Sequence, residues 1–255
     1  MSRTFTAGDL SVEVHDSTQA MGKAAAERAA AIVRTAVDTR GSARVVFATG
    51  NSQFSFVDAL SGQDVPWNRV HAFHMDEYVG IDADHPASFR RWIRERIEDR
   101  YAPASVAYIE GDAPDAQAEA DRYEALLRAE PLDLVCMGIG ENGHLAFNEP
   151  GAADFDDTRW ARIITLTPQS RRQQVGEGHF PDVDAVPATA ISLTVPALLS
   201  ATNVQVCVPE QRKAAAVAAT LGGEISTDCP ASILRRSPQA RLFLDPDSAS
   251  ALDPR

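Results

Sequence analysis

Residues 132–150 read LDLVCMGIGENGHLAFNEP, and they carry the pattern of an α/β fold. The stretch opens with an apolar run, residues 132–137, which predicts a strand buried on both faces. Three glycines follow within residues 138–143 and permit tight turns and a close approach of the backbone to a ligand. His144 and Glu149 come directly after them. Because ligands bind at the ends of strands in open α/β sheets, this stretch predicts a proton-transfer site.

Two other interpretations of this stretch need to be weighed. The spacing Gly138-x-Gly140-x-x-Gly143 formally fits a dinucleotide-binding fingerprint. That fingerprint requires a long helix after the glycines, with an acidic residue about twenty positions further on. Here residues 148–151, NEPG, interrupt the chain at once, so we expect no nucleotide site. By residue type alone, His144 is equally compatible with a hydrogen-bonded loop histidine.

Length and charge limit the function classes. A chain of 255 residues can bury one large α/β core or two small ones, and a single domain over residues 1–255 is the simplest account. The net charge of −12 argues against nucleic acid as a partner. It also means that an anionic substrate needs a local cluster of positive groups.

Nothing in the sequence predicts a membrane partner or export. No stretch approaches the roughly 18 to 20 apolar residues of a membrane-spanning helix, and the start, MSRTFTAGD, lacks the apolar core of a secretory signal. The three cysteines, Cys136, Cys207 and Cys229, form no CxxC motif. Cys136 and Cys207 lie within apolar runs. We therefore expect buried, reduced thiols and a cytoplasmic protein.

Helical and strand patterns alternate along the chain. Helices are predicted at residues 20–37, 54–60, 88–100, 114–129 and 211–221, and further strands at 43–48, 69–73, 162–166, 190–195, 204–208 and 241–244. This alternation predicts a Rossmann-like α/β domain, with a mostly parallel sheet and helices on both faces. The tail after Asp245 is expected to fray.

The loop Thr49-Gly50-Asn51-Ser52 lies between a predicted strand and a predicted helix. Its backbone N–H groups and two hydroxyls suit an anion such as phosphate. The alternative is an ordinary turn in which Ser52 caps the helix.

Two adjacent carboxylates, Asp76 and Glu77, follow another predicted strand. Since neighbouring residues of a strand point to opposite sides, only one of them should enter a cleft. A carboxylate there would have a raised pKa and could serve as a general base. A helix-capping or ion-paired role is equally compatible with the residue types.

A third candidate is the pair Arg212 and Lys213, at the start of the helix that follows residues 204–208. A cation at this end of a strand could meet a phosphate held by residues 49–52. The alternative is a solvated charge in the first helical turn.

Taken together, these features resemble the glucosamine-6-phosphate deaminase/isomerase family, which shares its fold with the 6-phosphogluconolactonases. The similarity runs in order over roughly residues 10–245. The matching motifs are Ala48-Thr49-Gly50 with Ser52, FHMDEYVG at residues 73–80 with HPAS at 85–88, GIG at 138–140 with GHLAFNEP at 143–150, and Lys213-Ala214.

The resemblance implies an enzyme of amino-sugar catabolism that converts glucosamine 6-phosphate to fructose 6-phosphate and ammonia, with no metal and no organic cofactor. Asp76 would move a proton between C2 and C1, and His144 would assist ring opening with Glu149 orienting it. Lys213 and the loop at residues 49–52 would hold the phosphate. The resemblance leaves a homo-oligomer open.

Two positions depart from the family pattern. Asn142 stands where well-known members have Asp, so a His–Asp–Glu relay becomes His–Asn–Glu and His144 should be a weaker base. At Gly178-His179-Phe180 the familiar phosphate-binding Arg is missing. Arg171 and Arg172 lie upstream and are candidates to replace it, as is His179.

The departures keep other functions open. The same fold could hydrolyse 6-phosphogluconolactone with His144 as the base, although the residues at 75–80, MDEYVG, are atypical of lactonases. Another amino sugar phosphate, such as galactosamine 6-phosphate, could be the substrate. A non-catalytic sensor of sugar phosphates is the third alternative.

Overall fold

A parallel sheet forms the centre of the molecule, as the alternating pattern predicts. The computed structural model describes residues 3–176, 178 and 180–253. The main sheet contains, in spatial order, β1 (Arg3–Ala7), β2 (Leu10–Val14), β11 (Ala240–Leu244), β10 (Asn203–Val208), β7 (Leu134–Met137), β3 (Ala43–Phe47), β4 (Val70–His74) and β6 (Ser105–Ala107). All neighbours pair in parallel except β1 and β2, which form an antiparallel pair at one edge.

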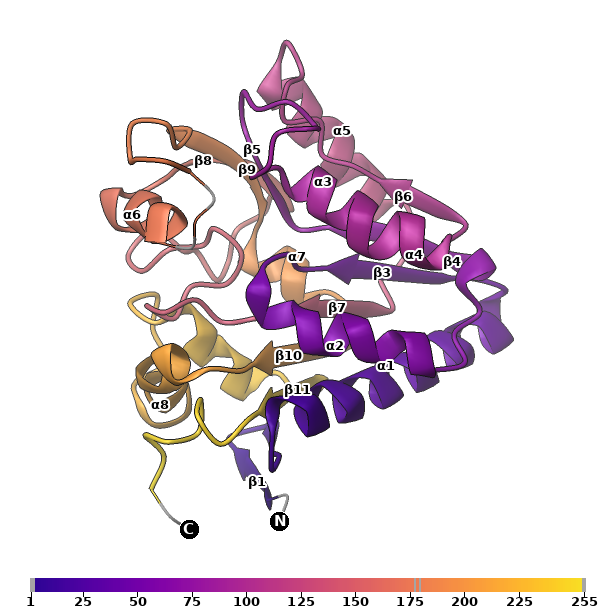
Figure 1. The fold of residues 1–255 in the computed structure, drawn as a ribbon, viewed down its shortest axis with the longest axis vertical. Helices are drawn as coiled ribbons and strands as arrows, with labels where there is room; N and C mark the ends of the chain where they lie inside the picture. Colours follow the sequence, from indigo (N-terminus) through magenta and orange to yellow (C-terminus); the bar gives the residue numbers. More distant parts are fainter. Residues whose placement is uncertain (1–2, 177, 179, 254–255) are drawn as a thin grey trace.

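Helices cover both faces of this sheet (Figure 1). One face packs against α1 (Thr18–Arg40), α2 (Phe54–Ala59) and α3 (Phe89–Ile93), which a π-helical turn (Arg94–Glu98) extends into α4 (Asp99–Tyr101). The other face packs against α5 (Ala116–Arg128), α7 (Val195–Leu199) and α8 (Ala214–Gly222). Strand residues alternate between the two faces: Val45 and Phe47 meet α1, and Val46 belongs to the opposite core.

Local sequence explains how α1 begins, ends and packs. Ser17 caps it by accepting from the Ala20 N–H at 3.1 Å, and Gly41 ends it in the left-handed conformation with φ 84°. Its buried face is made of small residues, and a side chain on Gly22 would lie 2.5 Å from the backbone of Ser55. The alanine-rich pattern therefore allows α1 to lie close to α2 and the sheet.

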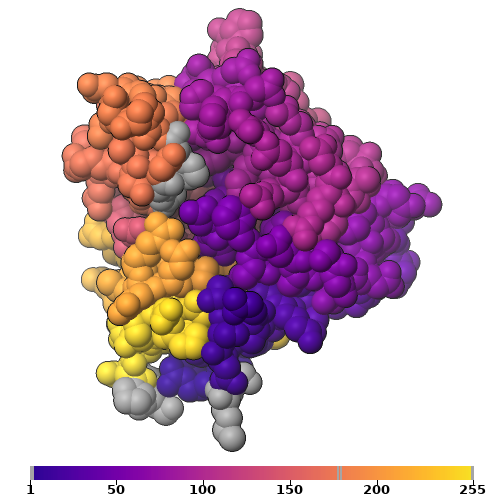
Figure 2. All heavy atoms as spheres, viewed as in Figure 1, coloured from indigo at the N-terminus to yellow at the C-terminus, as the bar shows by residue number. Residues whose placement is uncertain are grey.

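A second, three-stranded antiparallel sheet stands beside the main one. It consists of β5 (Asp76–Tyr78), β9 (Thr189–Leu193) and β8 (Ala161–Thr165), in that order. Figure 1 shows it with α6 (Pro168–Gly176) beyond the ends of the central strands. In Figure 2 the pink-to-orange part of the chain that contains β8, α6 and β9 lies beside the violet part. This small sheet, with Phe147, Phe180 and Tyr78 in its core, forms one wall above the main sheet.

The order of the strands reverses between β3 and β7. From β3 the chain adds β4 and β6 in one direction, and from β7 it adds β10 and β11 in the other. The carboxyl ends of β3, β4, β7 and β10 therefore surround one crevice, which is where ligands bind in doubly wound folds.

The α/β prediction with a mostly parallel sheet is confirmed, and each predicted helix and strand matches an element with shifts of a few residues at its ends. The sequence did not reveal β1, β2, β5, β6, α6 or α7, which are short or only partly apolar. The expectation of a frayed tail is wrong up to residue 253, because Ser248 is fully buried and Leu252 packs against the core.

Candidate active site

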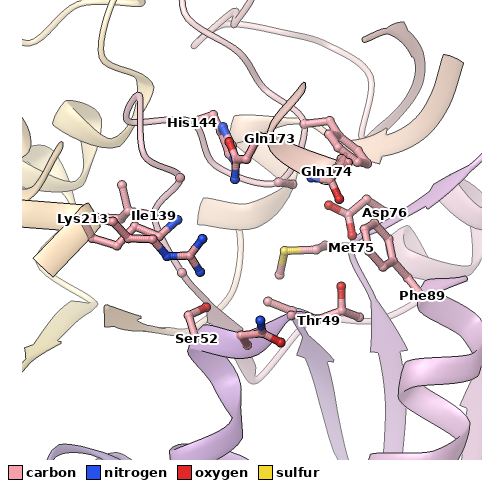
Figure 3. A pocket seen from close by; sticks show the side chains of 18 residues that line it. Thr49, Ser52, Met75, Asp76, Phe89, Ile139, His144, Gln173, Gln174 and Lys213 are labelled. Carbon is pink, nitrogen blue, oxygen red and sulfur yellow. The ribbon is translucent and has the colours of Figure 1, made fainter. Parts of the chain in front are cut away.

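One cavity lies at the crevice between the carboxyl ends of the central strands (Figure 3). The loops after β3, β4, β7 and β10 all contribute to it, and α3 and α6 close its sides. It is lined by Ala48, Thr49, Gly50, Asn51, Ser52, Met75, Asp76, Phe89, Gly138, Ile139, Gly140, His144, Ala146, Phe147, Gln173, Gln174, Arg212 and Lys213. Four stretches that are far apart in the sequence thus meet where their strands end.

Asp76 reaches the cavity because the chain leaves the main sheet after β4 and enters β5. Asp76 is only 7% exposed. Burial raises the pKa of Asp76 to about 8, and the neighbouring charge of Glu77 adds to this rise. The prediction of a raised pKa in this motif is confirmed.

Glu77 points away from the cavity, in agreement with the alternation of strand residues. Its carboxylate accepts hydrogen bonds from the Ser88 hydroxyl at 2.8 Å and from the backbone N–H of Arg90 at 2.8 Å and of Phe89 at 3.2 Å. It therefore anchors the start of α3, while Ser88 caps the same helix as predicted. Only Asp76 of this pair lines the cavity.

His74 is a fully buried residue that sequence reasoning left without a role. Its Nδ1 lies 2.9 Å from the Asp76 carbonyl, and its Nε2 accepts from the Ile109 N–H at 2.9 Å. Burial lowers the pKa of His74 to about 3, so the ring is neutral and Nδ1 carries its proton. This pair of bonds fixes the turn that aims Asp76 into the cavity. No local pattern distinguishes such a histidine from a catalytic one.

His144 stands across the cavity from Asp76 (Figure 3) and is backed by two polar partners. Asn142 Oδ1 lies 2.8 Å from His144 Nδ1, and Asn142 Nδ2 donates to Glu149 Oε2 at 2.7 Å. Glu149 Oε1 lies 3.3 Å from the same Nδ1 and accepts from the Ser170 hydroxyl at 2.5 Å. His144, Asn142 and Glu149 thus form one hydrogen-bonded group. Ser170 is a fourth member that no sequence pattern indicated.

Gly140 is required by the position of the His144 ring. A Cβ atom on Gly140 would lie 2.2 Å from the imidazole Cε1, closer than any real contact. The carbonyl of Gly140 accepts from Gly143, and its N–H donates to the His144 carbonyl at 2.9 Å. Gly140 therefore serves the placement of the histidine.

The opposite end of the cavity is suited to an anion. Residues 49–52 follow β3, with Gly50 at φ 95°, and the Ser52 hydroxyl accepts from Gln53 Nε2 at 3.1 Å. Ser52 makes no helix-capping hydrogen bond, so the alternative of a simple cap does not hold. Lys213, which is 5% exposed, faces this loop from the turn before α8 (Figure 3). The structure brings Thr49, Gly50, Asn51, Ser52 and Lys213 together.

Arg171 and Arg172 do not join this group. The Arg171 guanidinium donates to the Val183 carbonyl, and Arg172 is exposed; neither is among the described residues that line the cavity. The turn of α6 instead presents Gln173 and Gln174, and Gln174 Oε1 accepts from the Tyr78 hydroxyl at 2.6 Å. His179 lies outside the described residues.

Two findings on the described residues concern metal ions and membranes. Within residues 3–253, leaving aside 177 and 179, no three His, Cys, Asp or Glu side chains gather in a way that could hold a metal ion. In the same part of the chain, no helix combines the length and apolar character needed to cross a bilayer.

The fold and the cavity define the class: an α/β enzyme whose candidate active site lies at the switch point of a parallel sheet. A family model described as glucosamine-6-phosphate isomerases/6-phosphogluconolactonase matches residues 16–243. The chain belongs to this family.

Curated relatives support the deaminase side of the family. The chain is 34% identical over 206 residues to a protein of Exiguobacterium sibiricum named glucosamine-6-phosphate deaminase, covering 80% of this chain and 79% of that protein. It is 31% identical over 243 residues to a protein of the same name from Streptococcus gordonii, covering 95% and 98%.

Solved structures agree with this placement. A structure described as a monomeric glucosamine-6-phosphate deaminase superposes with a TM-score of 0.84 at 27% identity, covering 94% of this chain and 99% of that one. The 6-phosphogluconolactonase of Trypanosoma brucei superposes with a TM-score of 0.75 at 20% identity, over 94% and 98% of the two chains, which shows a common fold.

Proposed function

We propose that this chain converts glucosamine 6-phosphate and water to fructose 6-phosphate and ammonia. The observation that carries the proposal is Asp76, a buried carboxyl group with a raised pKa that lines one cavity with His144 and Lys213. A carboxylate of this kind suits the removal of a proton from carbon next to a C=O or C=N bond. Relatives named glucosamine-6-phosphate deaminase, at 31% and 34% identity, support the same reaction.

Ring opening is the first step in this proposal, and His144 carries it. Because His144 Nδ1 is held by Asn142 Oδ1, Nε2 is the nitrogen that exchanges protons. It takes the proton from the C1 hydroxyl and delivers it to the ring oxygen, which gives the open aldehyde. Glu149 supports the imidazolium that forms during this transfer.

Proton transfer between carbons follows, with Asp76 as the base. Its carboxylate removes the C2 proton while the C2 ammonium gives a proton to the C1 oxygen, which leaves an enolamine, and the resulting carboxylic acid then delivers its proton to C1. The ketose imine at C2 then reacts with water, and the carbon–nitrogen bond breaks to release ammonia. A pKa near 8 makes Asp76 both an adequate base and an adequate acid near neutral pH.

The phosphate fixes the substrate between these groups. In the proposal, the backbone of Thr49, Gly50 and Asn51, the Ser52 hydroxyl and the Lys213 ammonium hold it. Anchoring one end of an open-chain sugar orients C1 and C2 toward Asp76, which supplies much of the rate enhancement in reactions of this kind.

The test is to measure ammonia and fructose 6-phosphate from purified protein given glucosamine 6-phosphate. Galactosamine 6-phosphate and 6-phosphogluconolactone are assayed in parallel. Equal amounts of ammonia and ketose phosphate from the gluco sugar are expected. Ammonia from the galacto sugar alone would change the substrate assignment, and lactone hydrolysis without ammonia release would overturn the proposed reaction.

A further inference from the structure

Arg212 lines the cavity beside Lys213, and two carboxylates hold its guanidinium group. Arg212 Nε lies 2.5 Å from Glu210 Oε2, and Nη1 lies 3.1 Å from Glu141 Oε1. Glu141 belongs to the loop that leads to His144, and Glu210 precedes the turn (Gln211–Lys213) that carries Lys213. The guanidinium therefore bridges the histidine loop and the lysine turn.

The backbone at Glu210 is held in a conformation that favours glycine, with φ 81° and ψ 139°. The buried Asp245 carboxylate accepts from the Glu210 N–H at 3.3 Å, and the Glu210 carbonyl accepts from the Lys213 N–H at 3.1 Å. Asp245 is fixed in turn by the Thr18 hydroxyl at 2.7 Å. A rigid turn thus sets the direction of both cations, Arg212 and Lys213.

Arg212 is a second cation beside Lys213, and its charge and its planar guanidinium group both suit a phosphate. Among the described lining residues, Arg212 and Lys213 carry the positive charges, and Asp76 is the one carboxyl group. A sugar phosphate close to a dianion must bind a chain whose net charge is −12. A guanidinium can bind phosphate through two parallel N–H groups, which an ammonium cannot.

We propose that Arg212 binds the substrate phosphate together with Lys213, and that Glu141 and Glu210 compete with the phosphate for its guanidinium group. This inference rests on the proposed function for the identity of the anion. Arg171 and Arg172 are not among the described residues that line the cavity, so they do not share this contact. The carboxylates hold the guanidinium at the cavity and lower its affinity for phosphate.

Phosphate affinity distinguishes this proposal from a purely structural Arg212–Glu141 ion pair. The two alternatives predict different changes in affinity when the charge of Arg212 or of Glu141 is removed. If Arg212 only ties the two loops together, removing either partner of the Arg212–Glu141 pair loosens the site, and both changes weaken phosphate binding. If Glu141 competes with phosphate, removing its charge strengthens binding, whereas removing the charge of Arg212 weakens it.

Titration calorimetry with inorganic phosphate tests this without relying on turnover. Arg212→Gln should raise the Kd about tenfold or more, the loss of one charge-assisted contact, and Glu141→Gln should lower it about threefold. Arg212→Lys should fall between Arg212→Gln and the unchanged chain, because it keeps the charge and loses the planar fork. Arg94→Gln removes a surface arginine that pairs with Asp84, and should leave the Kd unchanged.

A Kd within twofold for Arg212→Gln, or weaker binding in both Arg212→Gln and Glu141→Gln, would overturn the inference. Thermal unfolding of each variant identifies one that has failed to fold, and Arg212→Lys then supplies the comparison. A further outcome is that glucosamine 6-phosphate yields no ammonia while the Kd for inorganic phosphate still rises in Arg212→Gln and falls in Glu141→Gln. That result would support the phosphate site and overturn the proposed reaction.

Discussion

Asp76 and Glu77 are adjacent carboxylates with different surroundings, and the difference sets their roles. Glu77 receives four hydrogen bonds, from the Tyr78 N–H, the Ser88 hydroxyl and the first N–H groups of α3. Asp76 faces the cavity, and its burial favours the protonated acid. In the proposed function Asp76 is the general base, and a general base must lose that proton before it can act, so we expect activity to follow the ionisation of this one carboxyl group.

Asp76→Asn should lower kcat about 10² to 10⁴-fold, the usual contribution of a general base. The Kd for inorganic phosphate should stay within twofold, because the anion end of the cavity keeps its groups. In the unchanged chain, kcat/KM should rise with pH and level off above about 8, as Asp76 ionises. Asp84→Asn, an exposed substitution, is the control. Substantial isomerisation by Asp76→Asn would remove Asp76 from the role of carbon base.

Asn142→Asp should raise the pKa of His144. The substituted side chain would place a negative charge 2.8 Å from His144 Nδ1, where a neutral amide now stands, and would face Glu149 without a hydrogen to share. Both effects favour the imidazolium, by about one pKa unit or more. NMR titration of the His144 ring measures this shift. An unchanged or lower pKa would contradict the hydrogen-bonded group described here.

At the scale of elements, the molecule builds its site from the ends of strands and the starts of helices. β5 turns Asp76 into the cavity, and the same strand turns Glu77 toward α3, so one short element joins the wall of the cavity to the helix beside it. Glu77 is fully buried. Its removal leaves N–H groups of α3 without their acceptor.

Glu77→Ala should lower the free energy of unfolding by about 3 to 5 kcal/mol, as expected when one partner of a buried charged network is removed. Glu77→Gln keeps one acceptor oxygen and should cost less. Glu95→Ala, which removes an exposed helical pair with Arg91, should cost less than about 0.5 kcal/mol. Urea unfolding measures all three. Equal decreases in the free energy of unfolding for Glu77→Ala and Glu95→Ala would show that Glu77 does not anchor α3.

For the whole molecule, two buried groups give opposite dependences of stability on pH. The pKa of Asp76 rises from 3.8 to about 8 on folding, so its contribution is fully present below pH 3.8 and is lost as the pH rises through 8. The pKa of His74 falls from 6.5 to about 3, so its contribution is present above pH 6.5 and is lost as the pH falls through 3. The two effects oppose each other between these limits.

Of these two groups, only Asp76 still affects the pH dependence above pH 6.5. The free energy of unfolding should therefore fall between pH 6.5 and 8, by at most about 1.4 kcal/mol per pH unit from this group. Asp76→Asn should remove the contribution of this group to that slope and raise Tm most at pH 8. Calorimetric scans of both chains at several pH values measure it. Parallel Tm profiles would mean that Asp76 is ionised throughout this range.

The sequence by itself determined the parallel sheet, the helices on its faces and the segments after the strands that carry Asp76, His144 and Lys213. Buried parallel strands are continuous apolar runs, and each loop follows such a run, so local pattern is sufficient. The tertiary structure alone decided that β8 and β9 leave the main sheet for an antiparallel one, because strand pairing depends on partners distant in sequence. It also decided that Arg171 and Arg172 turn away while Arg212 lines the cavity, and that His74 holds a turn. A charged or titratable side chain has no local signature of its partners, and those partners come from other elements.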